Sequence, residues 1–404
     1  TAPPVTPAEE FDFTTGTLPA NLTFARSGTA SYRAADGSLA YAAADVPRFA
    51  RDDSFAVTGL MIEPAATNSA WFSEDFTNAA WIKQAVTITA GATTAPDGTM
   101  TASKMVSTNV SGFHFIKKNS GAVKMAGSIF MKAEGLASAW IAVGRESAES
   151  VRAQAVVNLI DGSVVRTQVS SIENDFRIEK YIDGWWRVCL SGEPSASANT
   201  SLYFGPGTAG PTLHVGDGTQ GIYIWGGNVA AGATISSYIP TPGGSSATRA
   251  SESLSLTNVS GVGVGQGTLL VKMTHRAYID NAINAVLFTY RGSSTSNEMY
   301  ARFISSGIRC IAFVSTEQAN FVPLGPLAAD TTYSLAFAYK ANDFAASVNG
   351  NAVVVDTAGA VPPSVTALRI ANYSSDRQPI GVIHKFAYYN TRLPDATLVE
   401  LSAG

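Results

Sequence analysis

The residues of this sequence best suited to binding chemistry are aromatic and polar side chains that alternate with apolar ones. Within 139–143, the alternation places Trp140 opposite the larger apolar residues and between small neighbours. A flat indole in that setting is a surface on which a sugar ring can stack. The same argument from alternation applies to residues 153–159, 185–190 and 201–204. The residues selected in this way are Trp140, Gln154, Trp185, Arg187 and Tyr203.

Together these side chains predict an aromatic and polar groove that binds a glycan. An alternative stays open at this point. The same faces can be covered by the other domain, by the N-terminal segment or by another subunit.

Carboxylate spacing argues against glycoside hydrolysis, which takes two carboxylates facing one sugar bond. The acids of residues 265–404 include no two that are two or four positions apart. Glu173 and Asp175 have the spacing of one strand face, but they lie in a polar stretch typical of a solvated edge. The sequence also lacks a P-loop and a nucleophile elbow. We therefore predict a protein that is not an enzyme, because a depolymerase would need a carboxylate pair assembled across subunits.

Metal ligands are also sparse. None of the histidines has a second His or Cys at a ligand spacing, which argues against zinc or iron; they are His114, His214, His275 and His384. We predict no cofactor. A structural calcium ion is compatible with Asp161 and Asp217, although a turn explains each Asp-Gly pair without one.

The composition favours an all-β protein. Of 404 residues, 46% are hydrophobic and 14% are charged, and 36 are glycine, a composition that suits short strands and tight turns. Strand-like segments recur from residue 65 to 240 and again from 265 to 404. They predict two β-sandwiches of jelly-roll or lectin-like type.

Two local signals refine the second sandwich. Asn349-Gly350 stands between two strand-like segments and predicts a hairpin, since a type I′ turn needs positive φ at both central residues. A short helix is expected over 394–401, where Pro394 and Asp395 suit the first turn.

Two stretches lie outside the predicted sandwiches, one between them and one before them. Residues 241–264 begin with prolines and glycines and are predicted to be a linker between the sandwiches. Residues 1–64 are predicted to be an N-terminal arm and lead-in segment that attaches to a particle or packs on the sandwiches.

Charge, hydropathy and cysteine content exclude several classes of partner. The formal net charge of −4 gives no footprint for nucleic acid, and no apolar run approaches the length of a membrane-spanning helix. No signal peptide is visible at the start. Cys189 and Cys310 fall in different predicted domains, which indicates buried free thiols.

Several stretches of the sequence resemble one family. "FARSGTASYRAADGSLAYAAADVPRF", "GLMIEPAATNSAWFSEDFTNAAWIKQAVTIT" and "GDGTQGIYIWGGNVAAGATISSYIPTPGGSSATRASE" resemble phage and prophage virion proteins of the tail or fibre type. "APDGTMTASKMV" and "DGWWRVCLSGE" are similar to the carbohydrate-binding-like jelly-roll module of that family. "GTLLVKMT", "TTYSLAFAYKANDFAASVNG" and "IGVIHKFAYYNTRLPDATLVELSA" resemble a concanavalin A-like, laminin-G-type sandwich.

The resemblance implies a virion surface protein, assembled in the host cytoplasm, that presents two lectin-like sandwiches and docks to other virion proteins. It also implies a homotrimer and a host-surface polysaccharide or lipopolysaccharide as ligand. It transfers no binding residues to this chain. A purely structural role, as a capsid decoration or baseplate protein, fits the same composition.

Overall fold

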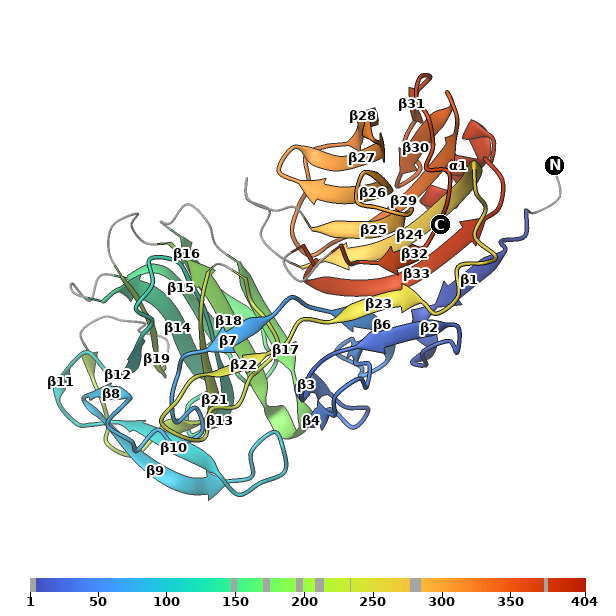
Figure 1. Cartoon of the computed structure of the whole chain (residues 1–404). Helices are drawn as coiled ribbons and strands as arrows, with labels where there is room; N and C mark the ends of the chain where they lie inside the picture. The colour runs from blue at the N-terminus through green and yellow to red at the C-terminus, as the bar shows by residue number, and fades with distance from the viewer. Residues whose placement is uncertain are drawn as a thin grey trace.

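The chain forms two β-sandwiches that lie side by side (Figure 1). The structure, a computed structural model, describes residues 5–146, 151–169, 175–193, 199–207, 214–232, 234–276, 285–373 and 377–404. Within these ranges the only α-helix is α1 (Asp395–Ala403), close to the C-terminus. The prediction of an all-β fold with two sandwiches and a short C-terminal helix is confirmed.

Two six-stranded sheets make the first sandwich. The β13 sheet has the order β17 (Phe176–Lys180), β18 (Trp186–Gly192), β13 (Met125–Glu134), β21 (Gly221–Ala231), β10 (Ala102–Ser107) and β9 (Val86–Thr93). The β14 sheet has the order β16 (Val164–Val169), β15 (Val151–Asn158), β14 (Ser138–Arg145), β19 (Thr200–Pro206), β12 (Phe115–Asn119) and β8 (Ile82–Gln84). Alternation along the strands directs apolar side chains such as Ile141 and Val188 into the layer between the sheets.

The second sandwich is larger. The β24 sheet has the order β31 (Val354–Asp356), β30 (Phe344–Val348), β29 (Thr331–Lys340), β24 (Gln266–His275), β33 (Gly381–Tyr389), β6 (Val57–Ile62) and β5 (Phe49–Arg51), and β1 (Glu9–Asp12) also pairs with β33. The β25 sheet has the order β2 (Leu22–Ala25), β23 (Ser253–Leu256), β32 (Ala367–Ile370), β25 (Val286–Arg291), β26 (Asn297–Ile304), β27 (Gly307–Val314) and β28 (Thr316–Leu324).

Smaller elements complete the described chain. They are the pairs β3 (Ala30–Arg33) with β4 (Leu39–Ala42), β7 (Ala66–Asn68) with β22 (Ala247–Arg249) and β11 (Ser111–Gly112) with β20 (His214–Val215), and the short 3₁₀ turns η1 (Phe13–Thr15) and η2 (Ile182–Gly184). No helix in the described part of the chain has the length and apolarity that crossing a bilayer would take.

The predicted hairpin turn lies between β30 and β31. Asn349 and Gly350 have φ values of 52° and 73°, so both central residues adopt the left-handed conformation that the sequence indicated. The Asn349 side chain also accepts a hydrogen bond from the Ser334 amide at 2.8 Å, which ties the turn to β29. This prediction is confirmed. The prediction of two free, buried cysteines is confirmed as well.

The N-terminal segment, predicted to attach to a particle or to pack on the sandwiches, contributes strands to one of them. β1, β2, β5 and β6 are strands of the second sandwich, and Phe11 and Leu60 lie in its core. These strands are three to six residues long, too short to show a clear alternation in the sequence. The β3–β4 hairpin contacts the first sandwich instead, where the Leu39 amide donates to the Pro96 carbonyl. The segment therefore contacts both sandwiches.

The predicted linker is also structured in part. Within 241–264, β22 pairs with β7, and β23 lies between β2 and β32. The linker prediction is wrong for β23, because its alternating Leu254 and Leu256 form a very short pattern among serines. The second sandwich therefore takes strands from three separate parts of the chain.

A cluster of five buried charged side chains, the Arg–Glu cluster, joins the segments that run between the two sandwiches. Its members are Arg26, Arg48, Glu63, Arg249 and Glu252. Arg48 donates to Glu63 at 2.7 Å and to Glu252 at 2.9 Å. Arg26 donates to Glu252 at 2.8 Å, and Arg249 lies 3.5 Å from Glu63.

The carboxylates of the cluster are saturated with donors. Backbone and hydroxyl donors of Ser237 reach both oxygens of Glu63, and the Glu63 amide donates to Glu252 at 3.0 Å. Burial opposes ionisation of Glu63, but the guanidinium groups of Arg249 and Arg48 outweigh it and lower the pKa of this carboxyl. Both glutamates therefore act as counter-ions for the three arginines.

Replacing Glu252 should be severely destabilising. Glu252→Gln keeps the shape of the side chain but leaves Arg26 and Arg48 short of a counter-charge in a buried site. We expect the free energy of unfolding in urea to fall by about 3–5 kcal/mol. The matched control is Lys385→Ala, which removes an ion pair to Glu10 from a lysine side chain that is 39% exposed. The control should cost less than about 1 kcal/mol, and equal losses would contradict the role given to the cluster.

His275 is a second polar group held inside the second sandwich. Its ring stacks on Phe303 with 4.5 Å between the centroids, and neither ring nitrogen has a hydrogen-bond partner in the described structure. Burial lowers the pKa of His275 from 6.5 to about 4.

The low pKa of His275 predicts a loss of stability in acid. The unfolded state binds a proton as the pH falls through about 6.5, whereas the folded state resists protonation until about pH 4. Stability is therefore complete above pH 6.5 and is lost between pH 6.5 and 4. We therefore compare the free energies of unfolding in urea of His275→Leu and wild type at pH 8 and at pH 4.5. The difference between variant and wild type should shift in favour of the variant by about 2–3 kcal/mol from pH 8 to pH 4.5. A variant that tracks wild type at both pH values would show that His275 titrates normally.

Candidate functional site

The five residues predicted to form a glycan groove are all buried. Their exposed fractions are 0% for Trp140, 5% for Gln154, 1% for Trp185, 2% for Arg187 and 1% for Tyr203. They also lie on two different sheets: three on the β14 sheet and two at or in β18 of the β13 sheet. Because the core of the sandwich separates these sheets, the outer faces point in opposite directions. The prediction of one exposed groove is therefore wrong.

The outer face of the β13 sheet is covered by other parts of the chain. Trp185 packs in a cluster with Leu39 of β4 and with Tyr238, and its indole donates to the Thr94 carbonyl at 3.1 Å. Arg187 donates to Glu179 at 3.2 Å and to the Ser236 carbonyl at 2.6 Å. The N-terminal hairpin and the segment after β21 therefore occupy this face, which is the alternative that the sequence left open.

The outer face of the β14 sheet does bring three predicted residues together. Ala142 pairs with Gln154 on one side and with Tyr203 on the other, so these side chains share a face with Trp140. Tyr203 packs edge-on against Phe115 and donates to the Arg145 carbonyl at 2.9 Å. Alternation along the strands therefore placed these three side chains on the correct face of the sheet. It gives no information about which other parts of the chain cover that face.

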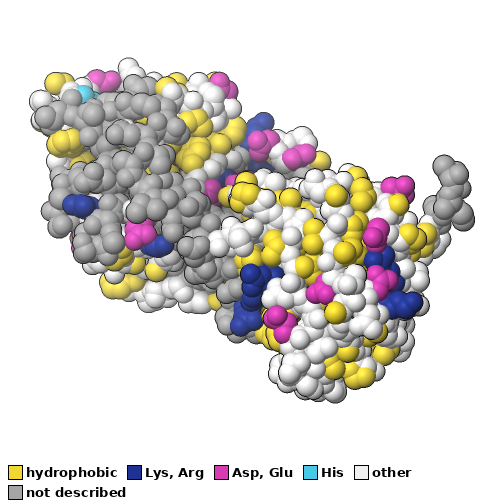
Figure 2. Space-filling view, turned by 90° about the horizontal axis from the view of Figure 1, so that it is seen from above, with side chains coloured by type: hydrophobic (Ala, Val, Ile, Leu, Met, Phe, Trp, Pro, Cys, Tyr) yellow, Lys and Arg dark blue, Asp and Glu magenta, His cyan; other side chains and the backbone are white. Residues whose placement is uncertain are grey.

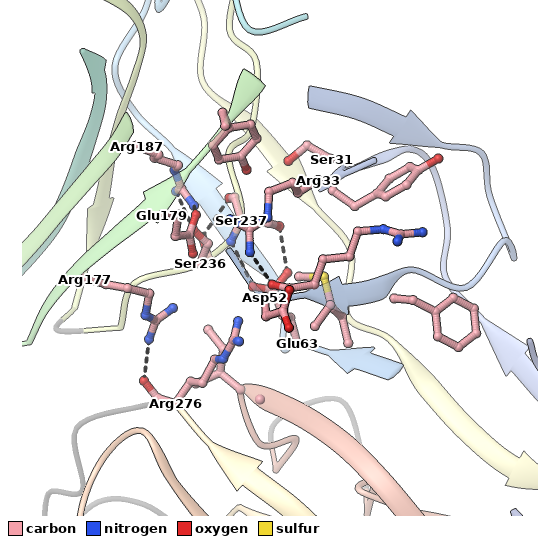
Figure 3. A pocket seen from close by; sticks show the side chains of 18 of the residues that line it. Ser31, Arg33, Asp52, Glu63, Arg177, Glu179, Arg187, Ser236, Ser237 and Arg276 are labelled. Carbon is pink, nitrogen blue, oxygen red and sulfur yellow. Dashed lines mark hydrogen bonds and ion pairs between the residues drawn. The ribbon is translucent and has the colours of Figure 1, made fainter. Parts of the chain in front are cut away.

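A polar cavity of about 340 Å³ lies where the two sandwiches meet (Figure 3). Its wall combines β3 and β5 of the N-terminal segment, β17 of the first sandwich, Ser236-Ser237 and the second-sandwich residues Arg276 and Asp330. One of the five predicted residues, Arg187, is part of this wall. We call this space the inter-sandwich cavity.

Hydrogen bonds across the inter-sandwich cavity hold the two sandwiches together. Arg177 of β17 donates to the Arg276 carbonyl at 2.8 Å and lies 3.6 Å from Asp330. Arg33 of β3 donates to the Lys180 carbonyl at 2.5 Å and to the Arg51 carbonyl. The cavity is thus framed by arginines that each bond to a different segment.

The acidic groups of the cavity are already engaged. Glu179 faces Arg187, Asp53 lies 3.2 Å from Arg33, and Asp330 lies near Arg177. Glu63 belongs to the Arg–Glu cluster. Burial opposes ionisation of Glu179, but Arg187 and Arg177 outweigh it and lower the pKa of its carboxyl.

Asp175 and Glu179 are a carboxylate pair that could be mistaken for catalytic groups. Burial raises the pKa of Asp175 to about 6, whereas that of Glu179 is lowered. Asp175 directly precedes β17 and Glu179 lies within it. Each carboxylate is paired with an arginine, Asp175 with Arg177 at 3.5 Å and Glu179 with Arg187 at 3.2 Å. Glu173, the partner considered for Asp175 in the sequence, lies outside the described residues.

The two calcium candidates form turns. Asp161 accepts from the Ser163 amide at 2.8 Å, and Asp217 accepts from the amides of Thr219 and Gln220 at 2.9 Å. Over the described ranges, no three His, Cys, Asp or Glu side chains gather as a metal ion would require.

A second candidate site is a shallow pocket of about 410 Å³ on the first sandwich, which we call the Trp71 shelf. The Trp71 side chain is 46% exposed. Lys118 of β12 places its ammonium 5.5 Å from the centre of the Trp71 ring, and Asn119 and Ser120 line the same pocket. The shelf lies at the β8–β12 edge of the β14 sheet, on the side away from the second sandwich (Figure 1).

The loop that carries Trp71 is held firmly. The Asn68 carboxamide oxygen accepts from the amides of Ala70 and Val229, and its nitrogen donates to the carbonyls of Gly227 and Ile239. The Trp81 indole donates to the Phe72 carbonyl at 2.9 Å. Trp71 is therefore an exposed ring on a fixed backbone.

Sequence reasoning missed both the Trp71 shelf and most of the inter-sandwich cavity. Trp71 follows β7 in an irregular loop, where alternation has no meaning. A weak signal did exist for the cavity: Arg177 and Glu179 alternate with apolar residues, and Arg276 directly follows β24. No sequence pattern shows that these segments meet.

On the face seen in Figure 2, the Lys and Arg side chains (dark blue) and the Asp and Glu side chains (magenta) of the described residues are interspersed. Hydrophobic side chains (yellow) are spread over both sandwiches on this face.

The sequence matches no family model and no curated protein. Among solved structures, part of the chain is similar to the CBM40 domain of the Ruminococcus gnavus IT-sialidase bound to α2,3-sialyllactose, with 11% identity, 35% of this chain and 83% of that chain covered, and a TM-score of 0.30. It is also similar to domain 4 of AbnA, an extracellular GH43 arabinanase of Geobacillus stearothermophilus, in complex with arabinotriose, with 12% identity, coverage of 43% and 83%, and a TM-score of 0.31.

A leech intramolecular trans-sialidase is a further structure of this kind, with 15% identity, 37% of this chain and 26% of that chain covered, and a TM-score of 0.31. Each of these three similarities covers less than half of the chain. At this level of similarity they define neither a ligand nor a site.

Truncating Trp140 should impair folding. Its side chain packs with Ala142, Val156 and Tyr203, so Trp140→Ala removes a large buried ring and leaves a cavity. We expect a loss of about 3–5 kcal/mol in the free energy of unfolding, measured in urea. Unchanged stability together with weaker glycan binding would restore Trp140 as a ligand residue.

Proposed function

We propose that this chain is a non-enzymatic surface protein of a bacteriophage virion, of the tail-fibre or receptor-binding type, which attaches to host-surface polysaccharide or lipopolysaccharide. The resemblance of its N-terminal and junction sequences to virion proteins supports the location. Two β-sandwiches support the mode of action, because such domains present rigid surfaces for ligand binding. In this proposal the protein assembles with other virion proteins, as a homotrimer.

The Trp71 shelf is the observation on which the binding function rests. A half-exposed tryptophan on a fixed loop offers a flat apolar face that costs little conformational entropy to use. Lys118, Asn119 and Ser120 add polar groups beside that face. Burial lowers the pKa of Lys118, and its ammonium already lies over the rings of Trp71 and Trp81. An apolar face with polar neighbours suits a sugar ring, which has apolar faces and a polar rim.

A structural role in the particle is the second candidate, and a different feature favours it. The β15–β16 turn and the start of β16 expose three apolar side chains at the edge of the β14 sheet, namely Ile160, Val164 and Val165 with exposed fractions of 68%, 43% and 56%. Exposed apolar groups on an edge strand suit contact with another protein. Both roles can coexist, since the Trp71 shelf lies at the β8–β12 end of the same sheet.

The binding function is tested with a panel of bacterial O-antigen and capsular oligosaccharides. We expect saturable binding of at least one glycan by the wild-type chain in calorimetry, at least tenfold weaker binding by Trp71→Ala, and partial retention by Trp71→Phe, which keeps a ring.

Met100→Ala is the matched control, because Met100 is an exposed apolar side chain outside the shelf. It should bind like wild type. No binding by the folded wild-type protein across the panel at millimolar ligand would exclude the attachment function and leave the structural role.

A further inference from the structure

The inter-sandwich cavity contains a guanidinium group, that of Arg276, without a direct partner among the described residues. Arg276 follows β24 and extends its side chain toward the middle of the group of residues in Figure 3. In the described structure no carboxylate lies within ion-pair distance of its guanidinium, and no side-chain hydrogen bond is formed by it. Burial and the nearby Arg177 lower the pKa of Arg276, and the carboxylates of Glu179, Asp330 and Glu63 offset this in part. An arginine nevertheless keeps its proton at neutral pH, so the cavity holds a partly exposed cation that makes no direct ion pair with the described residues.

The unsatisfied atoms of the cavity wall are all donors. Arg51 and Arg177 each have a buried Nε–H group without an acceptor in the described structure. No described residue of the wall has a buried acceptor that lacks a donor. Four acids of the wall face Arg187, Arg33, Arg177 or the Arg–Glu cluster, and Asp52 accepts from the amides of Ser54 and Ala56. A ligand that completes this site must therefore bring acceptor atoms for the unsatisfied guanidinium N–H groups.

The size and the remaining wall limit what that ligand can be. A cavity of about 340 Å³ is at the small end of ligand sites, which span about 300–1,000 Å³. Ser31, Tyr32, Ser236 and Ser237 supply hydroxyl and backbone groups beside the guanidinium groups. A carboxylate can accept two parallel hydrogen bonds from a guanidinium, and sugar hydroxyls can bond to the rest. Simple inorganic anions would leave most of the space unfilled.

We infer that the inter-sandwich cavity binds a carboxylated sugar unit of the host glycan, with Arg276 as the receptor for the carboxylate. This inference rests on the proposed glycan-binding function and names the class of sugar that this function recognises. A hexuronate and a nonulosonate such as a sialic acid share the required chemistry. The Trp71 shelf would then hold an uncharged part of a glycan through stacking, independently of the cavity.

The site is tested by calorimetry on the full chain with D-glucuronate, N-acetylneuraminate and the neutral isostere D-glucuronamide. We expect saturable binding of at least one carboxylated sugar and at least tenfold weaker binding of the amide. Arg276→Gln should lose binding at least tenfold, because a charge-assisted pair is removed. Its fold should survive, since Arg276 holds Arg177 through its backbone carbonyl; thermal unfolding checks this.

Two further variants sharpen the test. Arg309→Gln removes an arginine of β27 outside the cavity and should bind like wild type. Asp330→Asn removes a half-exposed negative charge from the wall and should bind the carboxylated sugar more tightly, by severalfold.

Three outcomes would overturn the inference: equal binding of glucuronate and glucuronamide, wild-type affinity in Arg276→Gln, or binding of inorganic phosphate as tight as that of either carboxylated sugar. Failure here is distinguishable from failure of the proposed function. If Trp71→Ala abolishes glycan binding and Arg276→Gln does not, the proposed function stands and the cavity is rejected as a binding site. If only Arg276→Gln abolishes the binding of sugar acids, the cavity is supported and the Trp71 shelf is rejected.

Discussion

The buried Arg–Glu cluster is the interaction on which the arrangement of this molecule depends. Five charged groups removed from water are tolerated only when each is close to opposite charge and well supplied with hydrogen bonds. Arg26 and Glu252 are 226 positions apart in the chain, and both are buried. The cluster is therefore satisfied only when the N-terminal segment, the β6–β7 connection and residues 249–252 meet in one geometry. That requirement fixes how the two sandwiches are joined.

The same cluster explains why certain stretches of sequence stand out. All five members lie in three stretches singled out in the sequence: Arg26 and Arg48 in 24–49, Glu63 in 59–89, and Arg249 and Glu252 in 216–252. Ser237, which donates to Glu63, lies in the third as well. These stretches thus encode a junction between sandwiches.

The fold was predictable because alternation is a local property of each strand. Segments such as those around Ile141 and Val188 reveal their buried face directly, and Asn349-Gly350 specifies its own turn. The site was not predictable, because exposure is decided by what packs on a face from elsewhere. Alternation places Trp185 on an outer face of its sheet, but Leu39 and Tyr238 pack against it in the structure. Trp71 lies in a loop that parity cannot assess, and its exposure depends on bonds made by Asn68 to residues far along the chain.

The inter-sandwich cavity follows from the cluster, because Glu63 belongs to both and Ser237, which lines the cavity, donates to Glu63. A wall built on a saturated ion network is rigid, so a ligand entering the cavity would lose little affinity to ordering of the protein. Shared residues also limit what can be varied: a change at Glu63 alters the junction and the cavity together. Arg276 differs, because its carbonyl serves the junction and its guanidinium faces the cavity. At this residue the stability of the fold and the chemistry of binding are carried by separate atoms, so ligand preference can change there while the junction stays intact.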